Sequence, residues 1–356
     1  MPAAPFRFGI IGPGMIAEFH ARAITDMPGA ELVAVYGRNR DKAAQFAARH
    51  GCAPYDDLDA FLAHTPLDIV TICTPSGNHL EPALAAASAG KHIICEKPLE
   101  VTLPRVDRMI DACAEVGVTL AGVFPRRFNP ATAILKSAVE AGRFGRIALA
   151  DAAVKWWRTQ AYYDSGAWRG TWALDGGGAL MNQGIHTVDL LLHVAGDVRS
   201  VRARTTLRAH AGIEVEDTAV AMLAFESGAL GTIQASTACW SASGHPAEIQ
   251  LCGEAGSAFL TDDKFRVWEF EPSRTEDTEV IANHGLATAG QAGAGAADPA
   301  AIDYRWHQRN FEDVVSAIRD GRNPAIDGRE ARRAIALIRA IYESAAAGGT
   351  EVEVAR

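Results

Sequence analysis

Between residues 6 and 124, short apolar runs alternate with longer segments in which apolar residues recur every three or four positions. The runs RFGII, ELVAVYG, LDIVTICTP, KHIICEKP and VTLAGVF predict strands that are buried on both faces. Segments such as DKAAQFAARHG, HLEPALAAASAG and LPRVDRMIDACAEVG predict the helices between them. This alternation indicates a doubly wound α/β domain built on a parallel sheet.

Beyond residue 198 the pattern changes to that of consecutive strands. SVRARTTLRA, TAVAMLAFESGALGTIQASTACW and AEIQLCGEAGSAFLTDDKFRVWEF predict strands joined by turns at ESGA and EAGS. The Gly/Ala-rich stretch over 286–301 then predicts a flexible loop, which either closes over a substrate or is a plain surface linker. The last helices begin near His307.

The segment GGGALMNQGIHTVDLLLH, from Gly176 to His193, has a helical pattern with an unusual polar stripe. The polar residues are spaced four, three and four positions apart, so one helix would carry them on one face. A solvent-facing stripe is the ordinary interpretation, but Lys, Glu and Arg are absent between Gly176 and His193, which favours the wall of a cleft. The stripe consists of Asn182, His186, Asp189 and His193.

The first predicted strand leads into a glycine-rich turn. Gly12, Gly14 and Ala17 fit the pattern G-x-G-x-x-G/A, in which phosphates bind backbone N–H groups at a helix N-terminus. Ligands of parallel sheets bind at the carboxyl ends of the strands, so we expect residues 12–15, 36–40, 74–79 and 96–98 to converge. The expected cofactor contacts are Gly12, Pro13, Gly14, Met15, Ile16, Arg38, Thr74, Pro75, Asn78, His79, Glu96 and Lys97.

The residues after the second strand bear on the choice of dinucleotide. An acid about 20 residues past the glycine motif binds the ribose of NAD, but residues 36–40 are Tyr, Gly, Arg, Asn and Arg. Arg38 suits a 2′-phosphate, which favours NADP over NAD. The alternative is that Arg38 lies on the adenine while NAD binds without the acidic contact.

Composition restricts the class of protein. The chain has 356 residues and a net charge of −9, enough length for two domains, and no basic cluster that would bind nucleic acid. Its six cysteines show no zinc-type or redox spacing, which predicts reduced thiols. The sequence shows no signal-peptide core and no apolar run of about 18 residues. We therefore expect a cytoplasmic protein that does not bind membranes. We expect no metal site either.

Two further segments carry candidate chemistry. Lys97 follows a buried strand; it is either a solvated lysine or a proton donor or acceptor whose pKa a cationic nicotinamide lowers. Residues 156–172 contain six Trp and Tyr residues, which could stack on sugar rings or form a sheet face or subunit interface. The substrate contacts expected here and on the polar stripe are Trp157, Tyr163, Trp168, Arg169 and Asp189.

In this order and spacing, GPGMIA, TPSGNH, CEKPL, FPRRFNPA, GRFGRI and the segment with His186 resemble the glucose–fructose oxidoreductase / inositol dehydrogenase family (Gfo/Idh/MocA). The resemblance implies a Rossmann domain over 1–124. It implies a second α/β domain over 125–356 with a large, mostly antiparallel open sheet, one face of which associates as a homo-dimer or homo-tetramer. It also adds Arg127 as a cofactor contact and His307 as a substrate contact.

The family's catalytic set is a lysine, a histidine and an aspartate four residues before the histidine. These map to Lys97, His186 and position 182, which is Asn here. The resemblance thus implies an NAD(P)-dependent oxidoreductase that transfers hydride between a secondary hydroxyl of a sugar or polyol and nicotinamide. We expect His186 to take the hydroxyl proton, Lys97 to stabilise the alkoxide and Asn182 to orient the hydroxyl. Two other family activities remain open, a redox-assisted glycosidase that uses bound NAD and a non-catalytic cofactor-sensing regulator.

Overall fold

The computed structural model describes residues 4–286 and 303–356. They divide into two compact units: unit 1 comprises residues 4–125 and 303–332, and unit 2 comprises residues 126–286 and 333–356. From the sequence we expected all residues after 124 to form a second domain, whereas residues 303–332 pack in unit 1. The predicted Gly/Ala-rich loop lies, apart from Leu286, outside the described residues.

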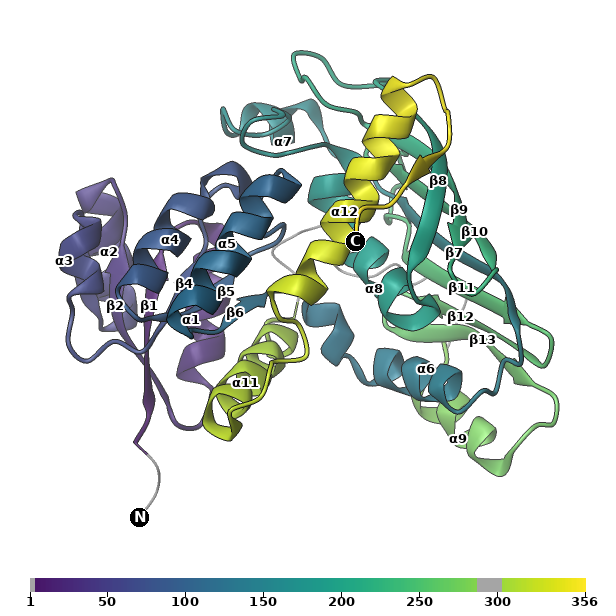
Figure 1. Cartoon of the computed structure of the whole chain (residues 1–356), viewed down its shortest axis with the longest axis horizontal. Coiled ribbons are helices and arrows are strands. Elements are labelled where there is room, and N and C mark those ends of the chain that lie inside the picture. The colour runs from purple at the N-terminus through teal and green to yellow at the C-terminus, as the bar shows by residue number, and fades with distance from the viewer. Residues whose placement is uncertain (1–3, 287–302) are drawn as a thin grey trace. The chain divides into compact units, whose positions relative to one another are not determined.

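Unit 1 contains the predicted parallel sheet, with six strands in the order β3-β2-β1-β4-β5-β6 (Figure 1). The strands are β1 (Phe6–Ile11), β2 (Ala30–Tyr36), β3 (Ala53–Tyr55), β4 (Ile69–Ile72), β5 (His92–Cys95) and β6 (Leu120–Gly122). The connections are α1 (Met15–Thr25), α2 (Arg40–His50), α3 (Leu58–Leu62), η1 (Ser76–Asn78), α4 (Leu80–Ser88) and α5 (Leu103–Val116). Strand β3 is not among the strands predicted from the sequence, because three residues are too few to show a period.

Helix α11 (Arg305–Asp320) joins unit 1 through its apolar face. Phe311 is fully buried and stacks on Phe8 of β1, with 6.3 Å between ring centroids. Burial of one such ring stabilises a fold by about 1.5–3 kcal/mol. The side-chain oxygen of Asn310 also accepts a 3.0 Å hydrogen bond from the backbone N–H of Phe124. These contacts explain why a segment so late in the chain belongs to the first unit.

Unit 2 is built on an eight-stranded sheet in the order β13-β12-β11-β7-β10-β9-β8-β14. Among the described strands of this sheet, only the β7–β10 pair is parallel, so the expected mostly antiparallel sheet is confirmed. The strands are β7 (Ile147–Lys155), β8 (Val198–Thr206), β9 (Thr218–Phe225), β10 (Leu230–Ser236), β11 (Ala247–Gly253), β12 (Gly256–Thr261), β13 (Lys264–Phe270) and β14 (Val352–Glu353).

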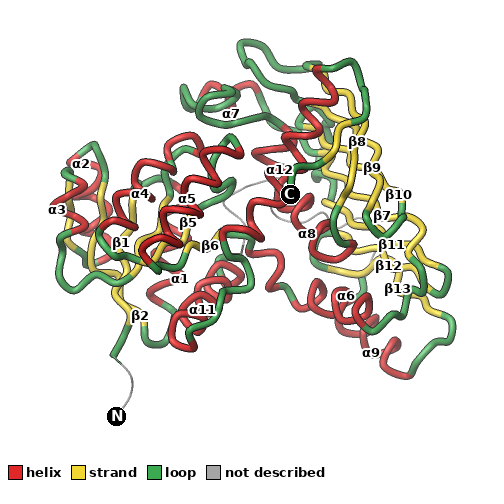
Figure 2. Tube along the Cα trace, in the orientation of Figure 1, coloured by secondary structure: helices red, strands yellow, loops and turns green. Residues whose placement is uncertain are grey.

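The helices of unit 2 lie on one face of this sheet, as Figure 2 shows for α6 and α8. The opposite face carries no helix among the described residues and exposes Met222 and Leu230, at 59% and 58%. Successive strand residues point to opposite faces, so β9 alternates buried and exposed positions. The remaining elements are η2 (Pro125–Phe128), α6 (Pro130–Glu140), α7 (Gln160–Asp164), η3 (Ala179–Gly184), α8 (Ile185–Ala195), α9 (Thr275–His284) and α12 (Gly328–Ala346).

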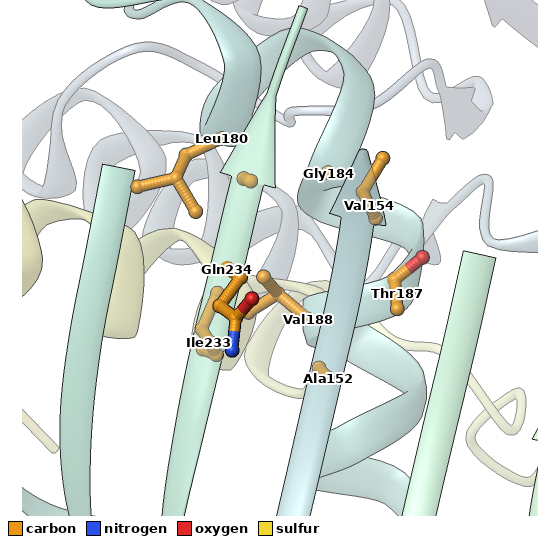
Figure 3. A pocket seen from close by; sticks show the side chains of 9 residues that line it. Ala152, Val154, Leu180, Gly184, Thr187, Val188, Ile233 and Gln234 are labelled. Atoms are coloured by element: carbon orange, nitrogen blue, oxygen red, sulfur yellow. The ribbon is translucent and has the colours of Figure 1, made fainter. Parts of the chain in front are cut away.

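Helix α8 and the turn before it pack tightly on β7 and β10. In Figure 3, Val188 of α8 lies beside Ala152 and Ile233 of the two strands. The space among these side chains is too small for a water molecule, so this contact fixes the helix on the sheet and is not a ligand pocket. No described helix combines the length and the apolar character that a bilayer crossing requires.

Candidate functional site

The glycine turn after β1 has the geometry of a phosphate-binding loop. Gly12 has φ +97°, and its N–H donates to the carbonyl of Tyr36 at 2.8 Å. A Cβ on Gly12 would lie 3.1 Å from the carbonyl of Cys73, so no larger residue fits without strain. Gly14 is exposed at the N-cap of α1, where unpaired backbone N–H groups attract anions.

The other loops at this sheet edge converge on it, as the strand order predicted. Gly37 lies so close to Pro13 that a Cβ would be 2.7 Å from the proline ring. The imidazole of His79 joins two more loops, because Nδ1 lies 2.9 Å from the carbonyl oxygen of Pro98 and Nε2 lies 2.8 Å from that of Thr74. Arg38 is exposed beside the convergent edge, while Lys97 is partly buried.

A buried ion pair supports the turn that carries Lys97. Nε2 of His20 lies 2.9 Å from the Oε1 of Glu96, and the Oε2 of Glu96 accepts a 3.1 Å hydrogen bond from the N–H of Lys97. Burial by itself would lower the pKa of His20, but Cys73 and Glu96 raise it to about 10. Burial alone would raise the pKa of Glu96, but the contact with His20 lowers it to about 2. Both groups are therefore charged at neutral pH.

His307 completes this buried cluster. One ligand atom each of His20, Glu96 and His307 lies within 4.8 Å of the others, a grouping that also suits a divalent metal. The direct hydrogen bond between His20 and Glu96 satisfies those two groups without a metal, so we interpret the cluster as an ion pair. Burial lowers the pKa of His307 to about 4, which keeps it neutral, and its side chain is 95% removed from solvent.

In unit 2, the polar stripe does not lie on one regular helix. Residues 179–184 form a π-helical turn, η3, and α8 begins only at Ile185. The predicted single helix is therefore wrong over this part, because a wider turn breaks the 3.6-residue period. Asn182 lies in η3 and His186 in the first turn of α8, and both are partly exposed, whereas Asp189 is buried.

The amide of Asn182 has a fixed orientation. Its Nδ2 donates to the Oδ1 of Asp175 at 2.5 Å, and its Oδ1 accepts from the Nε2 of Gln183 at 2.9 Å. Because a carboxylate only accepts, the amide nitrogen must face Asp175. Position 182 thus lacks the expected carboxylate, but Asp175, 99% buried, places one directly against it.

A second set of side chains surrounds Tyr162. Its hydroxyl lies 2.8 Å from the Nη1 of Arg169 and 2.9 Å from the Nε2 of Gln183. Arg169 also lies over the rings of Tyr162 and Trp168, at 4.2 and 4.4 Å from their centroids. Arg158 donates to Gln183 at 2.9 Å. Two guanidinium groups and the amide of Asn182 are therefore linked through Gln183.

The other predicted ligand contacts occupy different environments. Arg127 and Asp189 form a buried bidentate ion pair, with distances of 2.7 and 2.5 Å, which ties η2 to α8. Tyr163 is buried against His210. Trp157 is partly exposed. Contacts of these residues with cofactor or substrate remain predictions.

Several polar residues of this region were not predicted from the sequence. Asp175 precedes the three glycines, and Gln183 follows Asn182 directly. The available signal for Asp175 was its place directly before a glycine turn, since acids there accept hydrogen bonds from backbone N–H groups. Nothing in the local pattern identified Arg158 or His20, because each depends on a partner from another element.

Comparison with known proteins agrees with this architecture. Residues 6–124 match the family model described as an oxidoreductase family with an NAD-binding Rossmann fold, and residues 132–259 match the GFO/IDH/MocA C-terminal domain. The chain belongs to the GFO/IDH/MocA family. Its first unit is accordingly an NAD-binding Rossmann domain, and the protein is an oxidoreductase.

Named relatives and solved structures of this family cover most of the chain. D-glucoside 3-dehydrogenase of Escherichia coli is 30% identical over 73% of this chain and 78% of its own. Myo-inositol 2-dehydrogenase of Thermotoga maritima is 28% identical over 93% of both chains. The WlbA dehydrogenase from Bordetella pertussis, solved in complex with NADH and UDP-GlcNAcA, has a TM-score of 0.88 and 33% identity over 100% of this chain and 99% of its own.

The contact between Asp175 and Asn182 predicts that the family's usual aspartate is unfavourable here. Asn182→Asp brings two carboxylates to hydrogen-bonding distance, so we expect the free energy of unfolding at pH 8 to fall by about 1–3 kcal/mol. The double variant Asp175→Asn/Asn182→Asp restores one donor and should recover most of the loss. Urea unfolding measures both, and a single variant as stable as the wild type contradicts the interpretation.

The ion pair of His20 and Glu96 predicts a pH-dependent stability. Because the pKa of His20 is raised, its protonated form stabilises the fold. This stabilisation is complete below pH 6.5, the ordinary pKa, and is lost as the pH rises through about 10. Because the pKa of Glu96 is lowered, its ionised form also stabilises the fold. This stabilisation is complete above pH 4.5, the ordinary pKa, and is lost as the pH falls through about 2. His20→Gln should therefore lower the free energy of unfolding most between pH 4.5 and 6.5, by about 3 kcal/mol.

Urea unfolding of His20→Gln and wild type at pH 3, 6 and 9.5 measures this difference. A loss of stability that is equal at all three values would mean that packing, and not the ion pair, accounts for the effect of His20.

Proposed function

We propose that the protein is an NAD(P)-dependent dehydrogenase that moves hydride between a secondary hydroxyl of a sugar derivative and nicotinamide. The observation that carries the proposal is the presence of the family's lysine and histidine in supported positions. Lys97 follows a glutamate that a buried ion pair holds, and His186 lies in the first turn of α8, the helix that follows the turn with Asn182. A cofactor-sensing regulator would need neither residue.

UDP-GlcNAcA, an acidic nucleotide-linked sugar, is the first candidate substrate. The WlbA dehydrogenase that was solved with this compound is 33% identical over the whole chain. Arg158 and Arg169 support an anionic substrate, because both guanidinium groups connect to Asn182 through Gln183 and Tyr162. Inositols and glucosides, named for other relatives, form the comparison group.

In the proposed reaction, the hydride and the hydroxyl proton of the substrate go to different acceptors. When bound, oxidised nicotinamide supplies the acceptor for the hydride from the carbinol carbon. His186 accepts the hydroxyl proton as general base, for which an imidazole is suited near neutral pH. Lys97 stabilises the developing alkoxide by its charge. Asn182, with its amide oriented by Asp175, holds the reacting hydroxyl by a hydrogen bond.

Activity on UDP-GlcNAcA, myo-inositol and glucosides, followed by the absorbance of reduced cofactor, tests the proposal. His186→Ala should lower kcat by about 10²–10⁴-fold while the Kd for NADH stays within about twofold, since the residue belongs to the other unit from the Rossmann sheet. His193→Ala, a histidine later on the same helix, is the matched control and should keep wild-type turnover. Unchanged turnover in His186→Ala would remove its assigned role.

Arg38 provides the test of cofactor choice. It is exposed beside the glycine loop, and the position lacks the acid that binds a ribose 2′-hydroxyl, which supports the preference for NADP. The relatives solved with NADH support NAD instead. Arg38→Ala should weaken NADPH binding about tenfold or more, because a guanidinium–phosphate pair is lost. If Arg38→Ala leaves the Kd values for both NADPH and NADH at their wild-type levels, the NADP preference is contradicted.

We also propose that the bare face of the unit 2 sheet associates with a second copy of the chain. Leu149 and Leu230 are register partners on this face and are 47% and 58% exposed, and Met222 lies nearby. Exposed apolar patches of this kind mark protein interfaces. Sedimentation equilibrium would reveal only a 37.8 kDa species if the proposal is wrong.

A further inference from the structure

A buried glutamate lies directly against the glycine turn that leads to Asn182. The Oε2 of Glu216 accepts the N–H of Gly178, and its Oε1 accepts the N–H of Leu180, both at 2.9 Å. The backbone carbonyl of Glu216 accepts the N–H of Ala179 at 3.1 Å. Three consecutive backbone N–H groups are therefore bound by one residue, which lies 36 to 38 positions later in the chain.

Tyr342 of α12 holds this glutamate from the opposite side. Its hydroxyl donates to the Oε1 of Glu216 at 2.9 Å, and the carboxylate is 95% buried. Burial raises the pKa of Glu216 to about 7 despite the hydrogen bonds from Leu180 and Gly178, which lower it. A buried carboxylate costs more to desolvate than an apolar side chain of similar size, so its presence suggests a requirement beyond packing.

The same contacts explain two of the three glycines. A Cβ on Gly178 would lie 1.7 Å from the carbonyl oxygen of Glu216, and a Cβ on Gly177 would lie 2.2 Å from the hydroxyl of Tyr342. Atoms at these separations overlap, so both positions exclude every larger residue. Glycine is therefore needed at 177 and 178 for close approach to Tyr342 and Glu216.

The anchored backbone leads straight to the candidate catalytic residues. The carbonyl of Gly178 accepts the N–H of Asn182 at 3.0 Å. The turn then continues into α8, which begins at Ile185 and carries His186 in its first turn. A negative charge at this end also suits the N–H groups of a helix N-terminus. Any displacement of residues 178–180 is passed on to the amide of Asn182 and to the start of α8.

We propose that Glu216, held by Tyr342, is a positioning residue that sets the placement of Asn182 and His186 for the dehydrogenase reaction. The inference rests on the proposed function for its catalytic consequence. It assigns no substrate contact to Glu216, which acts only through the backbone of residues 178–180.

Three variants test it: Glu216→Ala, Glu216→Gln and Tyr342→Phe. In Glu216→Ala we expect kcat to fall by about 10²-fold, the loss caused by a misplacement of about 1 Å, with the Kd for NADH within about twofold. Glu216→Gln keeps one acceptor oxygen and should recover part of kcat, and Tyr342→Phe should lie between it and the wild type. Asp277→Asn is the control, because this carboxylate likewise accepts a backbone N–H, that of Arg274, but at the start of α9.

Hydrogen exchange of the backbone amides, read by mass spectrometry, gives a result that does not depend on activity. Amides 178–182 should exchange at least about tenfold faster in Glu216→Ala than in the wild type, with helix α11 unchanged; Asp277→Asn should change neither segment. Unchanged exchange at 178–182 overturns the anchoring. Faster exchange with wild-type kcat overturns the positioning role.

A wild-type protein that reduces no cofactor with any sugar overturns the proposed function and the catalytic consequence, while the exchange result still decides whether Glu216 holds the turn. If Glu216→Ala does not fold, Glu216→Gln and Tyr342→Phe carry the same two readouts.

Discussion

Backbone N–H groups that are buried beside a loop must find an acceptor, and in this protein buried carboxylates supply it at the turns that matter most. Glu96 accepts the N–H of Lys97, Asp175 that of Gly170, and Glu216 those of Gly178 and Leu180. An unsatisfied buried N–H costs about 1–3 kcal/mol, so each of these turns is held in one conformation. The side chains that could act in chemistry stand on turns fixed in this way.

Each buried carboxylate needs its own compensation, and the three solutions differ. Glu96 is paired with a protonated His20, which lowers the pKa of the acid to about 2. Asp175 binds the amide of Asn182. Glu216 has only neutral donors, so burial dominates and its pKa is raised to about 7. The charge on the first anchor is therefore robust at neutral pH, whereas the charge on Glu216 is not.

The replacement at position 182 follows from the same constraint. The aspartate that the resemblance implies at this position would face Asp175 at hydrogen-bonding distance, and two carboxylates so close repel each other. An asparagine can donate to Asp175 and still present its amide to a substrate hydroxyl. A neighbour seven positions earlier in the chain thus favours asparagine over aspartate at position 182.

Features that depend on local spacing could be predicted from the amino-acid sequence: the parallel strands of the Rossmann sheet, the glycine loop at Gly12, the turn with Lys97 and the family to which the chain belongs. Which polar groups support these features became visible only in the folded chain. His20 and Glu96 are 76 positions apart, and Glu216 and Tyr342 are 126 apart, so no periodic pattern relates them. Local patterns report the preference of each segment for helix or strand, whereas the partner of a buried charge is set by how distant segments pack.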